Sequence, residues 1–148
     1  MKRVFLLAAL ALCLGLVVVG CRSKTGGTTD GTTDPGRDAF LNQNVLFDFD
    51  RYNIRQDQVG VIQSKVDYLQ QNSSLRTVIQ GHCDERGTEA YNEALGDRRA
   101  KAAYNFLVDH GISGSRLSTV SYGKDFPLDP GHNESAWQRN RRAQFVLQ

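Results

Sequence analysis

Apolar residues are crowded into the first twenty positions of the chain. Val4–Val19 is a nearly unbroken apolar run, and Lys2 and Arg3 precede it. A basic start, an apolar stretch shorter than a membrane span and a small residue before a cleavage point are typical of a secretory signal. We therefore predict that residues 1–20 form a signal segment that is removed. A plain N-terminal membrane anchor is the alternative.

Cys21 directly follows the apolar run in the string VVGC. This string resembles the lipobox of bacterial lipoproteins, which implies lipidation of Cys21 and anchoring through its acyl chains. Each buried CH₂ group of such a chain contributes about 0.8 kcal/mol of membrane affinity. Arg22 replaces the aspartate that tends to retain enteric lipoproteins at the inner membrane, so the resemblance implies the outer membrane. The alternative is that Cys21 merely ends an apolar run.

A polar stretch separates this start from the next apolar positions. Arg22–Asp38 is rich in Gly, Thr and Asp and contains no large apolar residue. Such a segment buries too little surface to offset its ordering entropy. We predict a flexible tether over residues 21–39 and a folded domain over residues 40–148, facing the periplasm.

The folded part alternates between strand and helix periodicities. Apolar spacing, caps and Gly or Asn stops predict strands, two long helices and a short one: strands Val45–Phe47, Arg76–Gly81, Arg116–Tyr122 and Arg142–Leu147, and helices Gln56–Asn72, Thr88–His110 and Ser135–Asn140. This order of elements, β-α-β-α-β-β apart from the short helix, predicts an α+β fold. Its mixed sheet has helices packed on one face, a two-layer sandwich.

The second long helix carries a charged residue on the edge of its apolar stripe. At about 100° per residue the stripe contains Tyr91, Leu95, Ala102 and Phe106. Arg99 and Asn92 fall at its edge, about 20° apart. A buried guanidinium needs an acceptor, and the nearest in sequence are Asp84 and Glu85. One interpretation is a structural bridge that pins loop to helix. The other is a pocket for a zwitterionic head group, since a guanidinium fork matches a carboxylate.

The residues around this helix also resemble a known family. Gly81–Ala100 (GHCDERGTEAYNEALGDRRA) is similar to the signature of OmpA-like peptidoglycan-binding domains, and most of all to the peptidoglycan-associated lipoproteins. Val45–Arg55, Val120–Pro127 and Gly131–Ala143 match further blocks in the same order. The resemblance covers about Val45–Leu147 and implies the OmpA-like fold.

The resemblance also implies a ligand and a set of binding residues. In that family the ligand is the meso-diaminopimelate of the peptidoglycan stem peptide, whose amino and carboxylate ends an Asp and an Arg clasp. Carried over by position, these are Asp84 and Arg99. The other residues implied to line the site are Asn92, Arg86, Leu95, Phe49 and Asp50.

Further partners follow from the resemblance alone. It implies binding of TolB and membership of the Tol-Pal envelope system, with roles in cell division and envelope integrity. The TolB surface would overlap the peptidoglycan site. Tyr122, expected to be exposed, and the Gly123–Pro127 loop are candidates for that surface, although packing on the sheet also explains Tyr122.

Charge and motifs argue against other functions. Once Lys2 and Arg3 leave with the signal, the chain has as many basic as acidic residues, so nothing suggests nucleic acid. A hydrolase built on His82, Asp84 and Glu85 is an alternative, but no known catalytic spacing is present. We therefore expect a binding protein, not an enzyme, with no cofactor.

The remaining thiol, Cys83, stands where Ala or Thr is common in the family. Without a second cysteine in the domain it has no intramolecular disulfide partner, and we expect it to be buried and inert. If exposed beside Asp84, it would make the site sensitive to oxidation. His82 and Cys83 alone are a weak metal signal, since two further ligands are missing, and we expect no metal.

Overall fold

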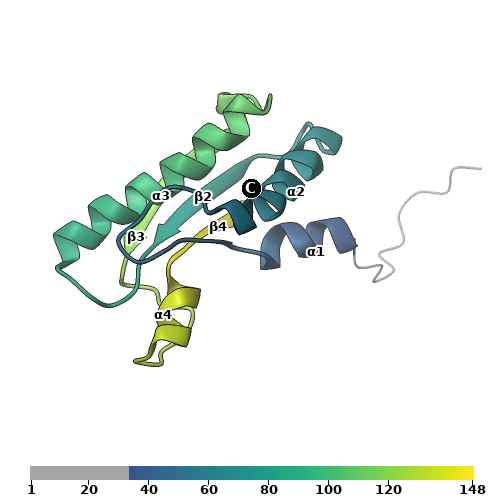
Figure 1. Cartoon of the computed structure of the whole chain (residues 1–148). Helices are drawn as coiled ribbons and strands as arrows, with labels where there is room; N and C mark the ends of the chain where they lie inside the picture. The colour runs from purple at the N-terminus through teal and green to yellow at the C-terminus, as the bar shows by residue number, and fades with distance from the viewer. Residues whose placement is uncertain (1–33) are drawn as a thin grey trace, which may run out of the picture. The chain divides into compact units, whose positions relative to one another are not determined.

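The computed structural model describes residues 34–148 as a sheet of four strands with helices against it (Figure 1). The predicted signal, Cys21 and most of the predicted tether lie outside the described residues. In the described part, no helix has the length and apolar character that crossing a membrane requires.

The first helix corrects the predicted boundary between tether and domain. Helix α1, Pro35–Asn42, begins within the stretch predicted to be flexible, so the folded part starts before residue 40. Asp34 caps it by accepting a hydrogen bond from the Gly36 amide at 2.9 Å. The missed signal was Asp34 followed by a proline at the first helical position, a common helix start.

Helix α1 is held to the domain at its C-terminal end. Phe40 is buried and packs against the rings of Tyr68 and Phe145. The buried Lys65 ammonium donates to the carbonyl oxygens of Ala39, at 2.9 Å, and Phe40. Burial lowers the pKa of Lys65 to about 8. The apolar residue at position 40 thus anchors the polar sequence before it.

The sheet has the mixed arrangement that was predicted. Its strand order is β1-β4-β2-β3. β4 runs antiparallel to β1 and β2, whereas β2 and β3 are parallel. The strands are β1 Val45–Leu46, β2 Thr77–His82, β3 Leu117–Gly123 and β4 Arg142–Leu147. Because parallel neighbours need a crossover, the long helix α3 joins β2 to β3.

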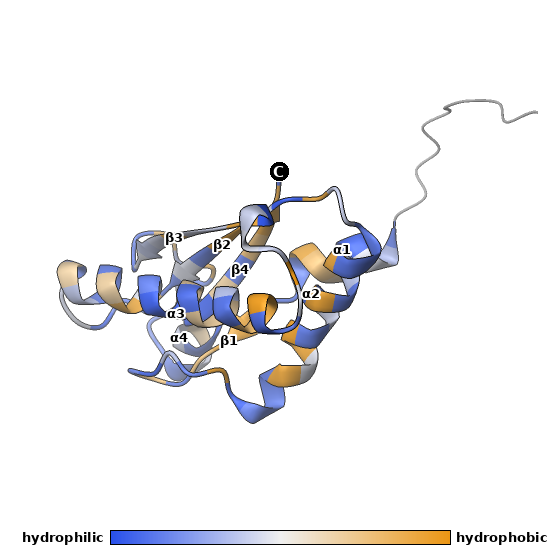
Figure 2. Ribbon diagram, turned by 90° about the horizontal axis from the view of Figure 1, so that it is seen from above, coloured by the Kyte–Doolittle hydropathy of each residue, from blue (hydrophilic) through white to orange (hydrophobic). Residues whose placement is uncertain are grey.

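The predicted helices are also present, with ends shifted by at most three residues. They are α2 Val59–Gln71, which the short 3-10 turn Gln56–Gln58 precedes, α3 Glu89–Asp109 and α4 Glu134–Asn140; a second 3-10 turn, Gly114–Arg116, leads into β3. Thr88 caps α3 as expected, its hydroxyl accepting from the Tyr91 amide at 3.2 Å. Apolar and polar residues alternate along α2 and α3 (Figure 2).

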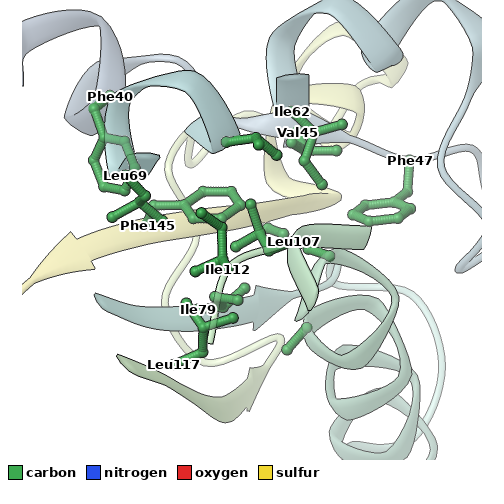
Figure 3. Packing of buried hydrophobic residues seen from close by; sticks show 14 residues of the cluster. Phe40, Val45, Phe47, Ile62, Leu69, Ile79, Leu107, Ile112, Leu117 and Phe145 are labelled. Carbon is green, nitrogen blue, oxygen red and sulfur yellow. The ribbon is translucent and has the colours of Figure 1, made fainter. Parts of the chain in front are cut away.

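The helices cover one face of the sheet, which confirms the predicted α+β class. Along β2, Thr77, Ile79 and Gly81 are buried, whereas the intervening Val78 and Gln80 are half-exposed. Ile79 pairs with Phe145 of β4 in register. On this face Phe145, Ile79 and Leu117 meet side chains from the helices in one core (Figure 3).

Helix α3 approaches the sheet on a different side from the predicted stripe. Tyr91 is exposed, and the buried positions are Asn92, Leu95, Gly96, Arg99, Ala100, Ala103 and Leu107. A Cβ atom on Gly81 of β2 would lie 1.8 Å from the carbonyl oxygen of Gly96. Backbones this close leave room only for small residues at the contact. The predicted stripe was based on large apolar side chains, so it lies on a different side of the helix from the residues that are buried. The close contact brings Asn92 and Arg99 to the end of β2.

Candidate functional site

A cavity of about 170 Å³ opens where α3 meets the segments that follow β1 and β2. The structure brings all seven residues of the predicted binding set to its wall: Phe49, Asp50, Asp84, Arg86, Asn92, Leu95 and Arg99. Four residues outside the predicted binding set also line it: Cys83, Gly87, Tyr91 and Arg141. Residues far apart in the chain therefore share one concave surface, at one end of the sheet.

Arg99 is fixed in the cavity wall by main-chain carbonyl groups. It is 1% exposed, and its guanidinium donates to the carbonyl oxygens of His82 at 2.8 Å, Arg51 at 2.9 Å and Asp48 at 3.1 Å. Of the two interpretations of Arg99, the structural bridge to Asp84 or Glu85 is wrong, because main-chain carbonyl groups take the place of these carboxylates. A guanidinium has more N–H donors than these three bonds use. Arg99 is also one of the residues that line the cavity.

Asp84 is paired, but with other arginines. Its carboxylate accepts from Arg86 Nη2 at 2.7 Å and Arg86 Nε at 3.2 Å, and from Arg141 Nη1 at 3.0 Å. Burial by itself would raise the pKa of Asp84, but the hydrogen bonds from Arg86 and Arg141 outweigh it, so the pKa lies below its usual value. Asp84 is therefore ionised at neutral pH and held between two cations.

Arg86 is stacked between two aromatic rings at the cavity mouth. The centre of its guanidinium lies 4.0 Å from the centroid of Phe49 and 4.1 Å from that of Trp137. Its Nη2 atom is also 3.7 Å from a carboxylate oxygen of the exposed Glu134. Cation–π contacts of this kind hold a cation without fixing its hydrogen bonds. Arg86 thus has a second acceptor within reach if it leaves Asp84.

The other cavity residues tie neighbouring segments together. The Tyr91 hydroxyl donates to the carboxylate of Asp50, whose backbone has a φ of 54° in the left-handed region. Asn92 donates to the carbonyl oxygen of Arg86 at 2.9 Å. These bonds hold the segment after β1 and the loop after β2 against the first turn of α3.

Glu85, the other expected acceptor for Arg99, points elsewhere. It accepts from Trp137 Nε1 at 2.8 Å and lies 2.7 Å from His132 Nδ1. Trp137 belongs to α4 and His132 precedes that helix. Glu85 therefore joins the loop after β2 to α4 and does not line the cavity.

Cys83 is buried, as expected, although it touches the cavity wall. Its thiol donates to the carbonyl oxygen of Asn92 at 3.3 Å, and burial raises its pKa to about 11. A thiol with such a pKa is a poor nucleophile at neutral pH. Within residues 34–148 no cluster of three or more His, Cys, Asp or Glu side chains is suited to a metal ion.

Tyr122 is less exposed than the sequence led us to expect. It is half-buried, and its ring stacks on His82 with centroids 5.4 Å apart. Packing on the sheet, the alternative explanation, therefore describes Tyr122 better than the expected role as an exposed residue of a recognition surface.

Arg141 is the main residue that sequence reasoning missed. It lies 57 positions from Asp84, directly before β4, and also bonds Glu134 at 2.6 Å. Its only signal was the paired arginines in the block Gly131–Ala143, where nothing in the local periodicity distinguishes a buried arginine from an exposed one. With it, three guanidinium groups and two carboxylates line the cavity. Such a set suits a ligand that carries both an ammonium and a carboxylate.

Comparison with known proteins agrees with this fold. Residues 46–141 match the model of the OmpA family. The chain is 40% identical to the peptidoglycan-associated lipoprotein of Mesorhizobium japonicum, covering 93% of this chain and 89% of that one. It is 36% identical to the protein of the same name from Pseudomonas aeruginosa, over 93% and 94%.

Solved structures show the same likeness. The peptidoglycan-associated lipoprotein of Burkholderia pseudomallei superposes with a TM-score of 0.72 at 36% identity, covering 78% of this chain and 98% of that one. The C-terminal domain of Helicobacter pylori MotB superposes with a TM-score of 0.67 at 20% identity, covering 72% and 84%, a likeness of fold alone.

Proposed function

This chain belongs to the OmpA family and to its peptidoglycan-associated lipoproteins, and we propose that it links the outer membrane to the cell wall by binding the diaminopimelate of the stem peptide in the cavity described above. The function is non-covalent binding. The observation that carries it is the arrangement of Arg99 and Asp84, opposite charges that line one cavity, the first on α3 and the second in the loop after β2.

Arg99 is the residue for the ligand's carboxylate. Its three bonds to main-chain carbonyls fix the plane of the guanidinium before any ligand arrives. The donors left over then form charge-assisted hydrogen bonds, which are shorter and stronger than neutral ones. Because the side chain is already ordered, little conformational entropy is lost on binding.

Asp84 is the residue for the ligand's ammonium, and this requires an exchange. Its oxygens already accept from Arg86 and Arg141. Arg141 is fully buried and fixed, whereas Arg86 is about one-third exposed and has Glu134 nearby. The ammonium therefore displaces Arg86 from Asp84, and Arg86 moves towards Glu134 while it stays between Phe49 and Trp137.

The remaining parts of the proposal concern the envelope. Acylated Cys21 anchors the chain in the outer membrane, the following residues form the tether, and the domain faces the periplasm. Binding of TolB and the other Tol proteins next to the cavity would make the two ligands competitive and suit a role in cell division. Many copies on one membrane facing one polymer give avidity even if a single site is weak.

Cosedimentation with purified sacculi tests the cavity. Asp84→Asn and Arg99→Lys keep the size of the side chains, and we expect each to reduce the retained fraction at least about tenfold, since each loses a charge-assisted bond. Asp97→Asn is the matched control: it removes the same charge from α3, where Asp97 pairs with Lys101 at 2.8 Å outside the cavity. Thermal unfolding must show that the variants remain folded.

The ligand is tested with sacculi whose stem peptides contain lysine in place of diaminopimelate. Lysine lacks the second carboxylate, so we expect weak retention. Equal retention on both kinds of sacculi, or full binding by both cavity variants, would refute the assignment. Anchoring is tested separately with Cys21→Ala, which should lose the acyl mass and leave the outer-membrane fraction.

A further inference from the structure

A second concave surface lies on the face of the sheet that the helices leave open. This open-face groove, of about 430 Å³, is lined by side chains of β2, β3 and β4 and by the loop after β3. Gln80 and Gln144 are register partners on adjacent strands, and both contribute to its wall. They alternate along their strands with the core residues Ile79 and Phe145, which places the groove on the opposite face of the sheet from the core and its helices.

Among residues 34–148, Arg142 has no carboxylate partner, although it lines this groove. It is 4% exposed, and its guanidinium has only long contacts, to Gln144 Oε1 at 3.2 Å and to the carbonyl oxygens of Phe126 at 3.3 Å and Asn140 at 3.4 Å. Its neighbour Arg141, by contrast, pairs with two carboxylates. Burial lowers the pKa of Arg142 to about 10. A buried guanidinium with neutral, distant acceptors favours an added anion.

His82 is the second unsatisfied group of the groove. It is 2% exposed, and neither ring nitrogen has a hydrogen-bond partner among residues 34–148. The imidazole ring of His82 stacks on the ring of Tyr122, and both residues line the groove. Buried polar atoms are nearly always bonded. Two adjacent buried side chains with unused donors therefore indicate a polar ligand with acceptor atoms.

The rim of the groove is apolar and fixed in place. Phe126 and Leu128 are 60% and 54% exposed and stand at its edge. The loop that carries them is held by Asn140, whose side-chain oxygen accepts from the amides of Leu128 at 2.8 Å and Asp129 at 2.9 Å. The groove thus combines a cationic floor, two amide side chains and an ordered apolar edge.

We propose that the open-face groove binds the free C-terminal carboxylate of a peptide chain that ends in an apolar residue. Arg142 and His82 donate to the carboxylate, which supplies the negative charge that the groove lacks. Gln80 and Gln144 each offer a donor and an acceptor to the last peptide group. The terminal side chain packs against Phe126 and Leu128. This site and its ligand are independent of the diaminopimelate cavity.

Titration by nuclear magnetic resonance tests the proposal on the chain from residue 22, which contains all of the described residues 34–148. The probe is N-acetyl-Gly-Gly-Val-Leu with a free C-terminus. We expect saturable shifts at the side-chain amides of Gln80 and Gln144 and at Arg142 Nε–H. The C-terminal amide of the same peptide should bind at least about tenfold more weakly, since it lacks the charge.

Two further probes locate the source of the carboxylate. Acetate should bind more weakly than the peptide, because it does not reach the apolar rim. N-acetyl-Gly-Asp-Leu-Gly-amide carries its carboxylate on a side chain and should be weaker as well. Equal binding of the amide peptide, the internal aspartate peptide or acetate would overturn the assignment of a terminal carboxylate.

Variants separate the groove from the cavity. Arg142→Gln should abolish the shifts. Because Arg142 is buried, a second variant, Leu128→Ser, changes an exposed residue. It should lower the affinity for the peptide about three- to tenfold. The control Val108→Ser, at an exposed apolar residue of α3, should leave that affinity unchanged. Leu128→Ser should leave binding to sacculi unchanged. Unaltered peptide affinity in Leu128→Ser would refute the groove, whatever the outcome for diaminopimelate.

Discussion

The binding cavity and the open-face groove each contain a nearly fully buried arginine, but the two arginines are satisfied in different ways. Arg99 has three main-chain acceptors at 2.8–3.1 Å, all good hydrogen bonds. Arg142 has three contacts at 3.2–3.4 Å. The first guanidinium holds three segments of the chain together, whereas the second contributes little to holding its neighbours.

This difference has consequences for stability and for binding. Removing Arg99 would leave three carbonyl groups without a donor, and unsatisfied buried groups are costly. Removing Arg142 would take away a charge whose burial is poorly compensated. We infer that the cavity is preorganised by its own fold, while the groove keeps a charge whose compensation must come from a ligand.

The largest expected effect comes from the contact that places α3 over the cavity. Gly81→Ala puts a Cβ atom 1.8 Å from the Gly96 carbonyl oxygen, so helix and strand must separate. We expect a loss of more than about 3 kcal/mol in the free energy of unfolding, at the upper end of overpacking effects. Urea denaturation measures it, and sacculus binding should fall with it because Asn92 and Arg99 move.

Gly60→Ala is the matched control for this change. Gly60 lies in α2, and a Cβ atom there meets nothing within 4 Å. Alanine in place of a glycine in a helix should stabilise by up to about 0.5–1 kcal/mol, and Gly60 lies in the first turn of α2. A Gly81→Ala protein as stable as the parent chain would contradict the close approach of α3 to β2.

The second prediction compares the two arginines directly. Arg99→Met should cost about 2–3 kcal/mol, because it orphans the carbonyl groups of Asp48, Arg51 and His82. Arg142→Met should cost less than about 1 kcal/mol, because weak contacts are lost together with an unpaired charge. Urea denaturation of both proteins at neutral pH gives the two values.

The order of these two values is what matters. Equal costs, or a larger cost at Arg142, would mean that its long contacts are as strong as those of Arg99, and the argument for an anion in the groove would lose its basis. Binding to sacculi should be lost only in Arg99→Met.

Much of the fold was predictable because its signals are local. Strand alternation, the Thr88 cap and the glycine after α3 each depend on a few neighbouring residues, and they located β2 to β4 and the long helix within one or two residues. Helix α1 was missed because its polar composition outweighed a two-residue start signal. Its docking depends on Phe40 and Lys65, contacts across about 25 positions that no local pattern reveals.

The site was predictable to a lesser extent. The resemblance named seven residues that do share one cavity, but reasoning from spacing alone paired Arg99 with Asp84. The acceptors of Arg99 are main-chain carbonyls, which every residue carries and no sequence pattern marks. One of the two partners of Asp84 is Arg141, which is brought to it by β4 lying beside β2. Such pairings depend on sheet order, which periodicity does not specify.

The most gradual expected effect is a difference in acid stability between the two regions, because it is spread over several pH units. Burial, aided by the charge of Arg142, lowers the pKa of His82 to about 3, whereas an unfolded histidine titrates near 6.5. Below pH 6.5 the unfolded chain binds a proton that the folded chain does not, so stability falls as the pH drops towards 3. The slope is at most about 1.4 kcal/mol per pH unit, or about 2 kcal/mol between pH 6.5 and 5.

The cavity responds to acid in a different range of pH. The pKa of Asp84 is lowered, so its contribution is present above the ordinary aspartate value of 3.8 and is lost only as the pH falls below that value. His82→Phe should therefore flatten the stability curve between pH 6.5 and 5 and leave the steeper fall below pH 4. If a C-terminal carboxylate occupies the groove, the peptide probe should also flatten the upper range, because a bound anion makes a protonated His82 less costly. Urea denaturation at half-unit pH steps, with and without the peptide, would separate these contributions, and a curve that His82→Phe leaves unchanged would show that His82 is not the group that senses acid.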